Sequence, residues 1–338
     1  MNYVGLDVHK KSIAYCVKRA DGTIEWEGSV AARRGDLTVW AQGLPRPWTA
    51  AMEATLFSDW IYDHLKTLGG EVKVGHPARM KAISSGKKKN DELDARVIAD
   101  LLRCGLLPEI YMIPAPLREL RQVLRYRHLL MRRTVQMKNK IAGLLMSMGV
   151  EYESTKLHQK GYFDGLMVAW RGKIPASARK LLEFSREQVE TLRRMDDKLI
   201  QGLKAHTEIA TRVKRLMTIP GVGEIMALTW VLEVGPVERL GNIARAQSFC
   251  GLTAAQKESA GKAVRGPISK QRNAHLQTVL IEVAHLAPRF NERLKAVYDS
   301  QIQRGHPNQA AIAVARKLVA YLMAADRGHE PRAVTLTT

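Results

Sequence analysis

Cysteine and long apolar runs are scarce in this chain of 338 residues. The three cysteines, Cys16, Cys104 and Cys250, lie far apart and form no CxxC pair. This pattern argues against a disulfide framework and against a zinc site, and it fits a reducing cytoplasm. No apolar run approaches the roughly 20 residues that a membrane helix needs, and the N-terminus lacks a signal-peptide pattern. We therefore expect a soluble, cytoplasmic protein without a membrane partner.

Acidic residues are also in short supply. Lys and Arg number 53 against 33 Asp and Glu, which gives a formal net charge of +20 and a pI near 10.0. Basic surfaces bind polyanions tightly because they release counterions from phosphates. A nucleic-acid partner is the favoured interpretation; the alternatives are a merely basic soluble protein or one that binds acidic membranes. The length predicts two or three domains, and a hydrophobic content of 46% allows a sizeable core.

The first hundred residues have the pattern of an α/β domain. Residues 2–8 and 12–18 are rich in β-branched and aromatic residues, and the Asp21-Gly22 turn leads into a third strand at 23–30. Helices and strands then alternate, with helices at 35–43, 56–69 and 91–105 and strands ending at Met52 and spanning 71–77. This order, βββ-α-β-α-β-α, predicts an RNase H-like (RuvC-like) domain over residues 1–113.

Long amphipathic helices are expected after Pro114 and Pro116. The segments 117–149 and 178–206 have apolar residues at helical spacing around a less regular stretch. They predict a helical hairpin or coiled-coil arm over 114–210. A mainly α-helical C-terminal domain over 211–328 and a frayed tail at 329–338 complete the chain. Gly221 and Gly223 indicate a helix-hairpin-helix-like turn that can face a phosphate, or else a tight turn that packs two helices.

Four carboxylates stand out in this basic chain. Asp7 lies late in the first strand, Glu53 closes a later strand, and Asp91 and Asp94 are three residues apart on a helix, so they share a face. Such a set can hold two divalent metals roughly 4 Å apart at a phosphate, and oxygen ligands suit Mg²⁺, with Mn²⁺ as a substitute. The ordinary alternatives are a strand-end Asp, a helix cap and a helix N-terminal acid.

Basic residues and two serines are further candidates. The lysines of the run before Asp91 and the arginines of the 118–140 helix can clamp a nucleic-acid backbone or form solvated surfaces. A serine can attack a phosphodiester where cations neutralise the phosphate, although a loop serine is ordinarily structural. The candidates for nucleic-acid binding are Lys87, Lys88, Lys89, Arg125, Arg132, Arg133, Lys262, Arg265 and Lys270, and the candidate serines are Ser259 and Ser269.

The chain resembles the DEDD transposases of bacterial insertion sequences related to the Piv-type DNA invertases, the recombinases described as guided by a bridge RNA. The N-terminal match rests on GLDVHK, MEAT and DELDA after a lysine run. The C-terminal match rests on TIPGVGEIMA, FCGLTAAQKESAGKAVRG and ISKQRNAHL. The resemblance extends over nearly the whole chain, and the ordered set of motifs is specific to the family.

The resemblance implies a RuvC-like domain joined through a coiled coil to a C-terminal transposase domain with a serine loop. It implies that Asp7, Glu53, Asp91 and Asp94 are the catalytic metal ligands. It also implies a nucleophilic serine, for which Ser259 is the best match, although Ala260 stands between it and Gly261 where the family has Gln-Ser-Gly. Ser269 is the alternative, in a Ser-Lys-x-Gly-Asn pattern with Arg272 in place of the glycine.

The function implied is DNA transposition through a covalent phosphoserine intermediate in a bacterial, nucleoid-associated enzyme. Its partners would be donor and target DNA, a noncoding guide RNA and further copies of the chain, as a dimer or tetramer.

Three alternatives stay open. A RuvC-like nuclease or junction resolvase would use the Mg²⁺ site without a serine nucleophile. An actin-like kinase would need a second Asp-Gly phosphate loop, which the sequence lacks. A non-catalytic nucleic-acid-binding protein would not need four intact acids.

Overall fold

The structure is a computed structural model that describes residues 1–83, 90–259 and 262–329, with the backbone alone for 256–259, 262–265 and 267. It divides into two compact units, Met1–Ala115 and Pro116–Thr338. Within the described ranges, we find no helix with the length and apolar character needed to cross a membrane. The finer division into three domains and a tail stays a prediction.

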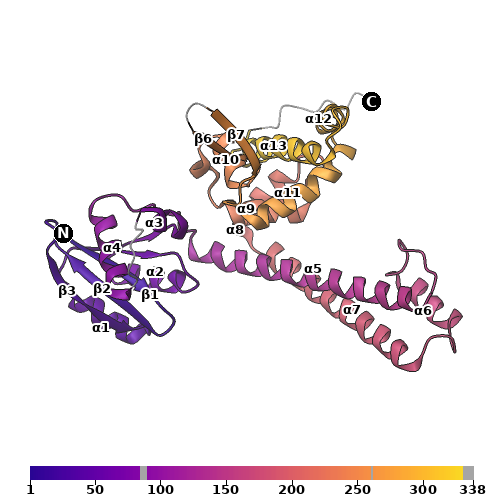
Figure 1. The fold of residues 1–338 in the computed structure, drawn as a ribbon, viewed down its shortest axis with the longest axis horizontal. Helices are drawn as coiled ribbons and strands as arrows, with labels where there is room; N and C mark the ends of the chain where they lie inside the picture. Colours follow the sequence, from indigo (N-terminus) through magenta and orange to yellow (C-terminus); the bar gives the residue numbers. More distant parts are fainter. Residues whose placement is uncertain (84–89, 260–261, 330–338) are drawn as a thin grey trace. The chain divides into compact units, whose positions relative to one another are not determined.

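The first unit is built on a five-stranded mixed sheet with the order β3-β2-β1-β4-β5 (Figure 1). The strands are β1 (Asn2–Val8), β2 (Ser12–Lys18), β3 (Ile24–Ala31), β4 (Trp48–Glu53) and β5 (Glu71–Gly75). The predicted antiparallel meander of the first three strands is confirmed, and β4 and β5 continue the sheet parallel to β1. Parallel neighbours need crossover connections, and helices supply them here.

Helices cover both faces of this sheet. They are α1 (Arg34–Gly43), α2 (Ser58–Thr67), α3 (Pro77–Ile83) and α4 (Asp91–Arg103). Leu37 of α1 and Ile61 of α2 belong to one core cluster with Leu6 of β1, whereas α4 packs on the opposite face against Ala51 of β4. The helices predicted at 35–43, 56–69 and 91–105 are confirmed, but α3 was not predicted, because its seven residues hold too few turns to show a periodic pattern.

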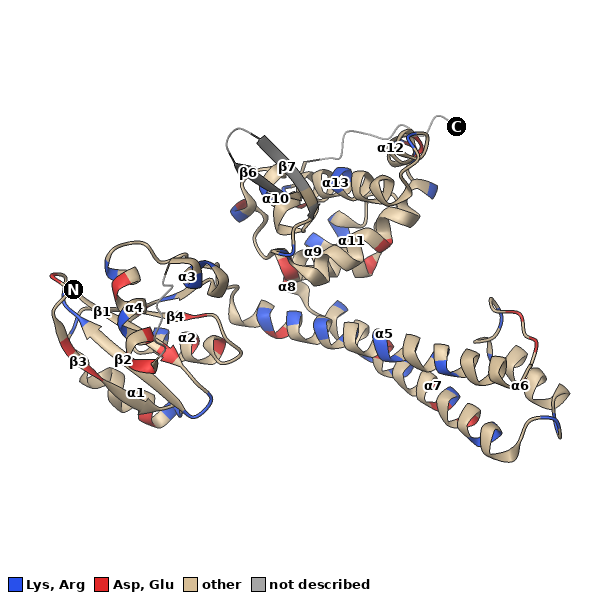
Figure 2. Cartoon of the chain, in the orientation of Figure 1, with Lys and Arg blue, Asp and Glu red and all other residues tan. Residues whose placement is uncertain are grey.

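The second unit begins with two long helices. They are α5 (Ala115–Ser147) and α7 (Ala176–Lys204), as predicted, and a shorter α6 (Lys160–Ala169) forms in the connection expected to be less regular. Ile141 and Leu145 of α5 share a core cluster with Leu182 of α7. Since Arg127 of α5 pairs with Asp196 near the other end of α7, the two helices run antiparallel. Basic side chains recur along α5 (Figure 2).

The rest of the second unit is mainly helical. Its helices are α8 (Thr207–Leu216), α9 (Glu224–Val234), α10 (Ile243–Phe249), α11 (Ala274–Leu286), α12 (Glu292–Ile302) and α13 (Pro307–Asp326), with short 3₁₀ turns at Val237–Leu240 and Ala287–Arg289. Gly221, between α8 and α9, has φ +90°, and a Cβ there would lie 2.8 Å from the Cα of Ala287. This close approach fits the alternative of a tight turn that packs two helices.

A two-stranded hairpin interrupts these helices, formed by β6 (Ala254–Ser259) and β7 (Lys262–Ile268). The segment predicted to carry the serine loop contains this hairpin, in which Ser259 ends β6 and is paired with Lys262 of β7. The two strands were not predicted, because the segment is rich in Gly and Lys and lacks the regular alternation of apolar and polar residues that marks a strand.

Candidate metal centre

The sheet brings the first two acids to one edge. β1 and β4 are parallel neighbours in which Gly5 is paired with Ala51 and Leu6 with Met52. Side chains alternate between faces along a strand, so Asp7 lies on the face of Gly5, and Glu53 lies on the face of Ala51. Both acids therefore lie at the carboxyl ends of adjacent strands and on the same face, which α4 covers.

The close approach of α4 to β1 brings the other two acids to the same edge. Gly5 makes this approach possible, because a Cβ at this position would overlap the backbone of Ala95 and Ala99. Ala95 and Ala99 are fully buried, and Asp91 lies one helical turn before Ala95 on the same row of side chains. Asn90 caps the helix by accepting a hydrogen bond from the Glu92 N–H, so α4 begins with its acids toward the end of β1.

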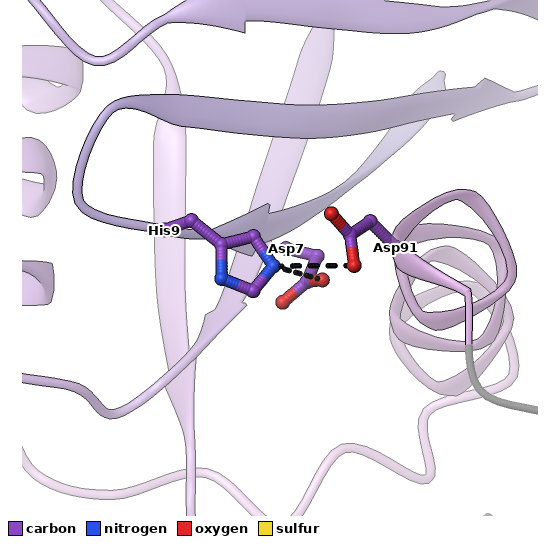
Figure 3. Close-up of side chains that lie close together, drawn as sticks. All are labelled: Asp7, His9 and Asp91. Atoms are coloured by element: carbon purple, nitrogen blue, oxygen red, sulfur yellow. Dashed lines mark hydrogen bonds and ion pairs between the residues drawn. The ribbon is translucent and has the colours of Figure 1, made fainter.

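The closest contacts at the centre involve a histidine that we did not predict to be functional. The His9 Nε2 atom lies 3.0 Å from Asp7 Oδ2 and 3.4 Å from Asp91 Oδ1 (Figure 3). Among the described residues, Asp7, His9 and Asp91 form a group whose ligand atoms all lie within 4.8 Å of one another. The sequence signal for His9 was present: it follows Asp7 by two residues and so leaves the strand on the same side.

The electrostatic surroundings of Asp7 favour the binding of a cation. Its side chain is only 17% exposed. Burial raises the pKa of the Asp7 carboxyl, and the charges of Asp94 and Asp91 raise it further, whereas the charge and hydrogen bond of His9 oppose the shift. A divalent cation stabilises the charge of a largely buried carboxylate that lies near two others. The oxygen-rich donor set thus fits a hard divalent metal, with His9 as a neighbouring nitrogen donor.

The predicted basic residues fall into three groups. Lys87, Lys88 and Lys89 lie outside the described residues, as do the side chains of Lys262 and Arg265. The side chains of Arg132, Arg133 and Lys270 are exposed, as a nucleic-acid surface requires. Arg125 is different, because it forms a bidentate pair with the fully buried Glu233, at 2.8 and 2.7 Å. Arg125 therefore has a partner within the protein, and a role in binding nucleic acid stays a prediction.

The two candidate serines occupy different parts of the β6–β7 hairpin. Ser259 is the last residue of β6, and its side chain lies outside the described part of the structure. Ser269 is at the base of the hairpin, where its N–H donates to the Thr253 carbonyl at 3.1 Å. The Ser269 hydroxyl accepts a hydrogen bond from the Gln271 N–H at 3.2 Å, which is the geometry of a structural serine turn.

Comparisons with known proteins are consistent over both units. Residues 4–149 match the DEDD family model of IS110-type proteins, described as Transposase, and residues 213–299 match the model of the Transposase IS116/IS110/IS902 family. Together the two models cover well over half of the chain.

Several curated proteins are similar along most of their length. The chain is 24% identical to a probable family 20 transposase of Pseudomonas aeruginosa, over 94% of both chains. It is 25% identical to the transposase for insertion sequence element IS1328 of Yersinia enterocolitica, over 93% of both. It is 24% identical to the transposase for insertion sequence element IS1111A of Coxiella burnetii, over 93% of this chain and 86% of that protein.

Proposed function

Because this chain belongs to the IS110 family of DEDD transposases and acts on DNA, we propose that it moves its insertion sequence by combining a Mg²⁺ centre with a serine nucleophile. The observation that carries the proposal is the convergence of Asp7 and Asp91 on His9, at 3.0 and 3.4 Å, at one edge of the sheet. A family of DEDD transposases implies divalent metal use, and this cluster of possible ligands supports the proposal that the metal binds here.

In this proposal the four acids hold Mg²⁺, with Mn²⁺ as a substitute. Asp7 and Glu53 would provide ligands from the sheet, and Asp91 and Asp94 from α4. The bound metal would supply positive charge for the scissile phosphate and for the oxygen that leaves it. The protein contributes orientation, since the strand register and the Gly5 contact fix where the carboxylates lie.

Ser259 is the proposed nucleophile. Its hydroxyl would lose a proton while its oxygen bonds to the scissile phosphorus, and the DNA oxygen on that phosphorus would leave and take up a proton. The reverse step, with a DNA hydroxyl attacking the phosphoserine, would rejoin the strands. The position of Ser259 at the end of β6 supports this choice over Ser269, whose hydroxyl already accepts a hydrogen bond at the hairpin base.

The remaining parts of the proposal concern architecture and partners. We propose that the sheet unit has a RuvC-like fold, that α5 and α7 act as a coiled coil, and that copies of the chain assemble around DNA. A noncoding guide RNA would select donor and target by base pairing, and the protein would bind backbone and shape. The exposed Arg132, Arg133 and Lys270 are the proposed phosphate contacts. The sequence offers Lys87–Lys89, Lys262 and Arg265 as further candidates.

A recombination-junction assay tests the proposal. A plasmid would carry the gene with its native flanking DNA as wild type, Asp7→Ala, Ser259→Ala and Ser269→Ala. We expect junctions from wild type and Ser269→Ala, and none from the other two variants.

Junction formation by Asp7→Ala at the wild-type level would refute the metal centre. Full activity of Ser259→Ala would leave Ser269 or water as the nucleophile. If Ser269→Ala then formed no junctions, Ser269 would be the favoured nucleophile. If Ser269→Ala still formed junctions, the mechanism would reduce to that of a RuvC-like nuclease or resolvase.

A further inference from the structure

A buried carboxylate below the β6–β7 hairpin has no part in the chemistry described so far. Glu233, near the end of α9, has a side chain with 0% exposure, and it accepts three hydrogen bonds. Two come from Arg125 of α5, and the third comes from the Asn273 side chain, at 2.7 Å. Burial by itself would raise the pKa of the Glu233 carboxyl, but the hydrogen bonds and charge of Arg125 and the hydrogen bond of Asn273 outweigh it and lower the pKa.

Asn273 connects this carboxylate to both ends of the hairpin segment. It follows β7 and caps α11, where its Oδ1 accepts a hydrogen bond from the Leu276 N–H at 3.0 Å. Its own N–H donates to the Phe249 carbonyl at 3.0 Å, just before the chain enters the hairpin. One residue thus closes the segment 250–272, caps the next helix and contacts Glu233.

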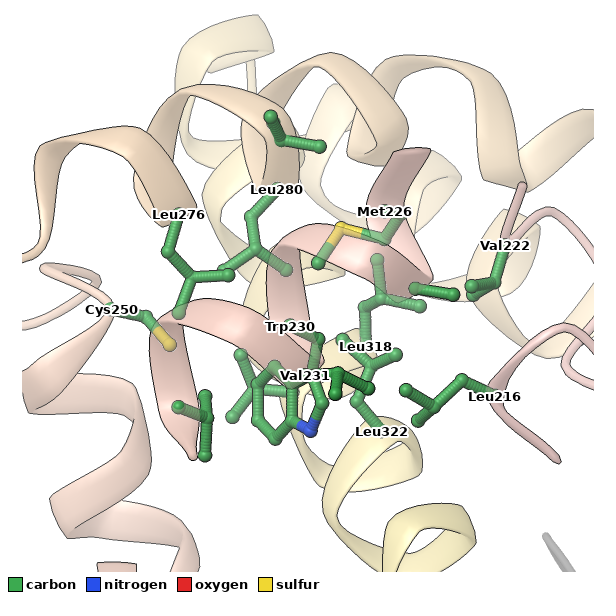
Figure 4. Close-up of a cluster of buried hydrophobic side chains, with 14 of the residues drawn as sticks. Leu216, Val222, Met226, Trp230, Val231, Cys250, Leu276, Leu280, Leu318 and Leu322 are labelled. Atoms are coloured by element: carbon green, nitrogen blue, oxygen red, sulfur yellow. The ribbon is translucent and has the colours of Figure 1, made fainter. Parts of the chain in front are cut away.

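Two further side chains hold the same base. Gln277 of α11 donates to the Gly251 carbonyl at 2.6 Å, and Arg316 of α13 donates to the Leu252 carbonyl at 2.7 Å. Below them the packed helices give a firm support, in which Trp230 of α9 and Leu276 of α11 share one buried cluster (Figure 4). The hairpin is therefore tied at its base to a well-packed body.

Stability alone is a weak reason to bury the Glu233 carboxylate, whose partner Arg125 remains 40% exposed. The desolvation of a buried charge offsets much of its attraction to a partner, so apolar side chains often replace such groups at no cost. Apolar side chains cannot form directional hydrogen bonds, whereas Glu233 orients both Arg125 and Asn273 through such bonds. We call these three residues the Glu233 anchor.

We propose that Glu233 is a positioning residue that acts through Asn273 to hold the β6–β7 hairpin, in which Ser259 is the last residue of β6. Arg125 completes the anchor from α5. The importance of this anchor for DNA joining rests on the proposed function of Ser259. The claim that the anchor orients the hairpin does not depend on that function.

Hydrogen exchange on the full chain, without DNA or metal, tests the mechanical claim. Asn273→Ser keeps a good helix cap but is too short to reach Glu233, and Asn273→Asp keeps the cap but sets a second carboxylate against the first. We expect both variants to speed exchange of the hairpin amides, residues 254–268, by about tenfold or more, because hydrogen bonds to charged groups are among the stronger ones. The amides of α13 should stay as slow as in wild type.

A swapped pair and a matched control sharpen the test. Glu233→Gln combined with Asn273→Asp removes the opposed pair of carboxylates and lets the new amide donate to the new carboxylate, at the loss of one hydrogen bond from Arg125. The double variant should therefore exchange more slowly in the hairpin than Asn273→Asp alone. Asp326→Asn alters a comparable fully buried carboxylate, bound by Arg212 and by the Trp230 indole away from the hairpin, and it should not affect residues 254–268 selectively.

Unchanged exchange in the hairpin of Asn273→Ser, or equal acceleration by Asp326→Asn, would overturn the proposal. The junction assay then separates the two hypotheses. If Asn273→Ser loosens the hairpin, and both Asn273→Ser and Ser259→Ala form no junctions, the results support both hypotheses. If Ser259→Ala remains active while Asn273→Ser loosens the hairpin, the positioning role stands and the serine mechanism fails.

Discussion

Single residues decide how the candidate metal centre is assembled, and Gly5 sets the distance between β1 and α4. The backbone of α4 occupies the space that a side chain at Gly5 would need. The close approach of helix and sheet is therefore a consequence of one missing Cβ, and the acids at the start of α4 depend on it.

Gly5→Ala should accordingly damage both stability and metal binding. Overpacking against backbone atoms costs about 1–3 kcal/mol, so we expect the urea midpoint of unfolding to fall. Isothermal titration should also show much weaker Mg²⁺ or Mn²⁺ binding, because α4 moves away from β1. Gly35→Ala in α1 is the matched control, since nothing lies within 4 Å of a Cβ there. Unaltered metal binding in Gly5→Ala would contradict the spacing argument.

The Asp7 carboxylate should lower the stability of the metal-free protein and be needed for metal binding. Its raised pKa means that the ionised carboxylate is held at a cost when no metal is present. Asp7→Asn removes that charge while keeping the shape, so the metal-free variant should unfold at a higher temperature than wild type near pH 7. Adding Mg²⁺ should raise the unfolding temperature of wild type and leave the variant unchanged. A variant that Mg²⁺ stabilises as strongly as wild type would argue against Asp7 as a ligand.

At the scale of elements, the contact between α5 and α11 contains two histidines whose surroundings favour the neutral imidazole. The rings of His128 and His275 lie 5.3 Å apart between centroids. Burial lowers the pKa of both, each is lowered further by neighbouring cationic groups, and Glu233 opposes the shift. A helix contact built on neutral imidazoles is sensitive to acid.

The sign of the pH effect follows from linkage. A lowered pKa in the folded state means that the unfolded chain binds protons first, so stability is present above the unfolded value of about 6.5 and is lost as the pH falls below it. We expect the urea midpoint to be lower at pH 5.5 than at pH 7.5, and His128→Gln to reduce that difference. The exposed His285→Gln is the control. Equal pH dependence in wild type and His128→Gln would refute the assignment.

At the scale of the whole molecule, the net charge of +20 predicts strong, salt-sensitive binding of nucleic acid. The two units each contribute to that charge, and α5 contributes exposed arginines. The charge gives affinity without sequence selection, which fits an enzyme whose target choice we assign to a guide RNA.

Reversing Arg132 and Arg133 to Glu should weaken DNA binding and flatten its dependence on salt. Each lost phosphate contact reduces the slope of log K against log salt by about 1. Fluorescence anisotropy with a short duplex measures this slope. Reversal of Lys295 and Arg304, in and just after α12, changes the net charge equally and serves as the control. If reversal of Lys295 and Arg304 lowers the slope as much as reversal of Arg132 and Arg133, the arginines of α5 do not contact phosphates specifically.

The sequence by itself determined most of the helices and strands and the set of acids. Strands 2–8 and 12–18, and the long helices α5 and α7, follow from local periodicity, which short-range packing enforces. The chain order of the four acids, together with the family motifs around them, is the basis on which we predict that they bind metal.

Only the tertiary structure decided the contacts that join distant segments. It brought His9 between Asp7 and Asp91, directed Arg125 onto Glu233, and paired the two strands β6 and β7 within the segment predicted to hold the serine loop. These features depend on which faces meet, on the absence of a Cβ at Gly5 and on hydrogen bonds between residues more than 30 positions apart. Sequence periodicity reports which residues share a face of one helix or strand. It does not report which faces of distant segments meet, because these contacts form only when the chain has folded.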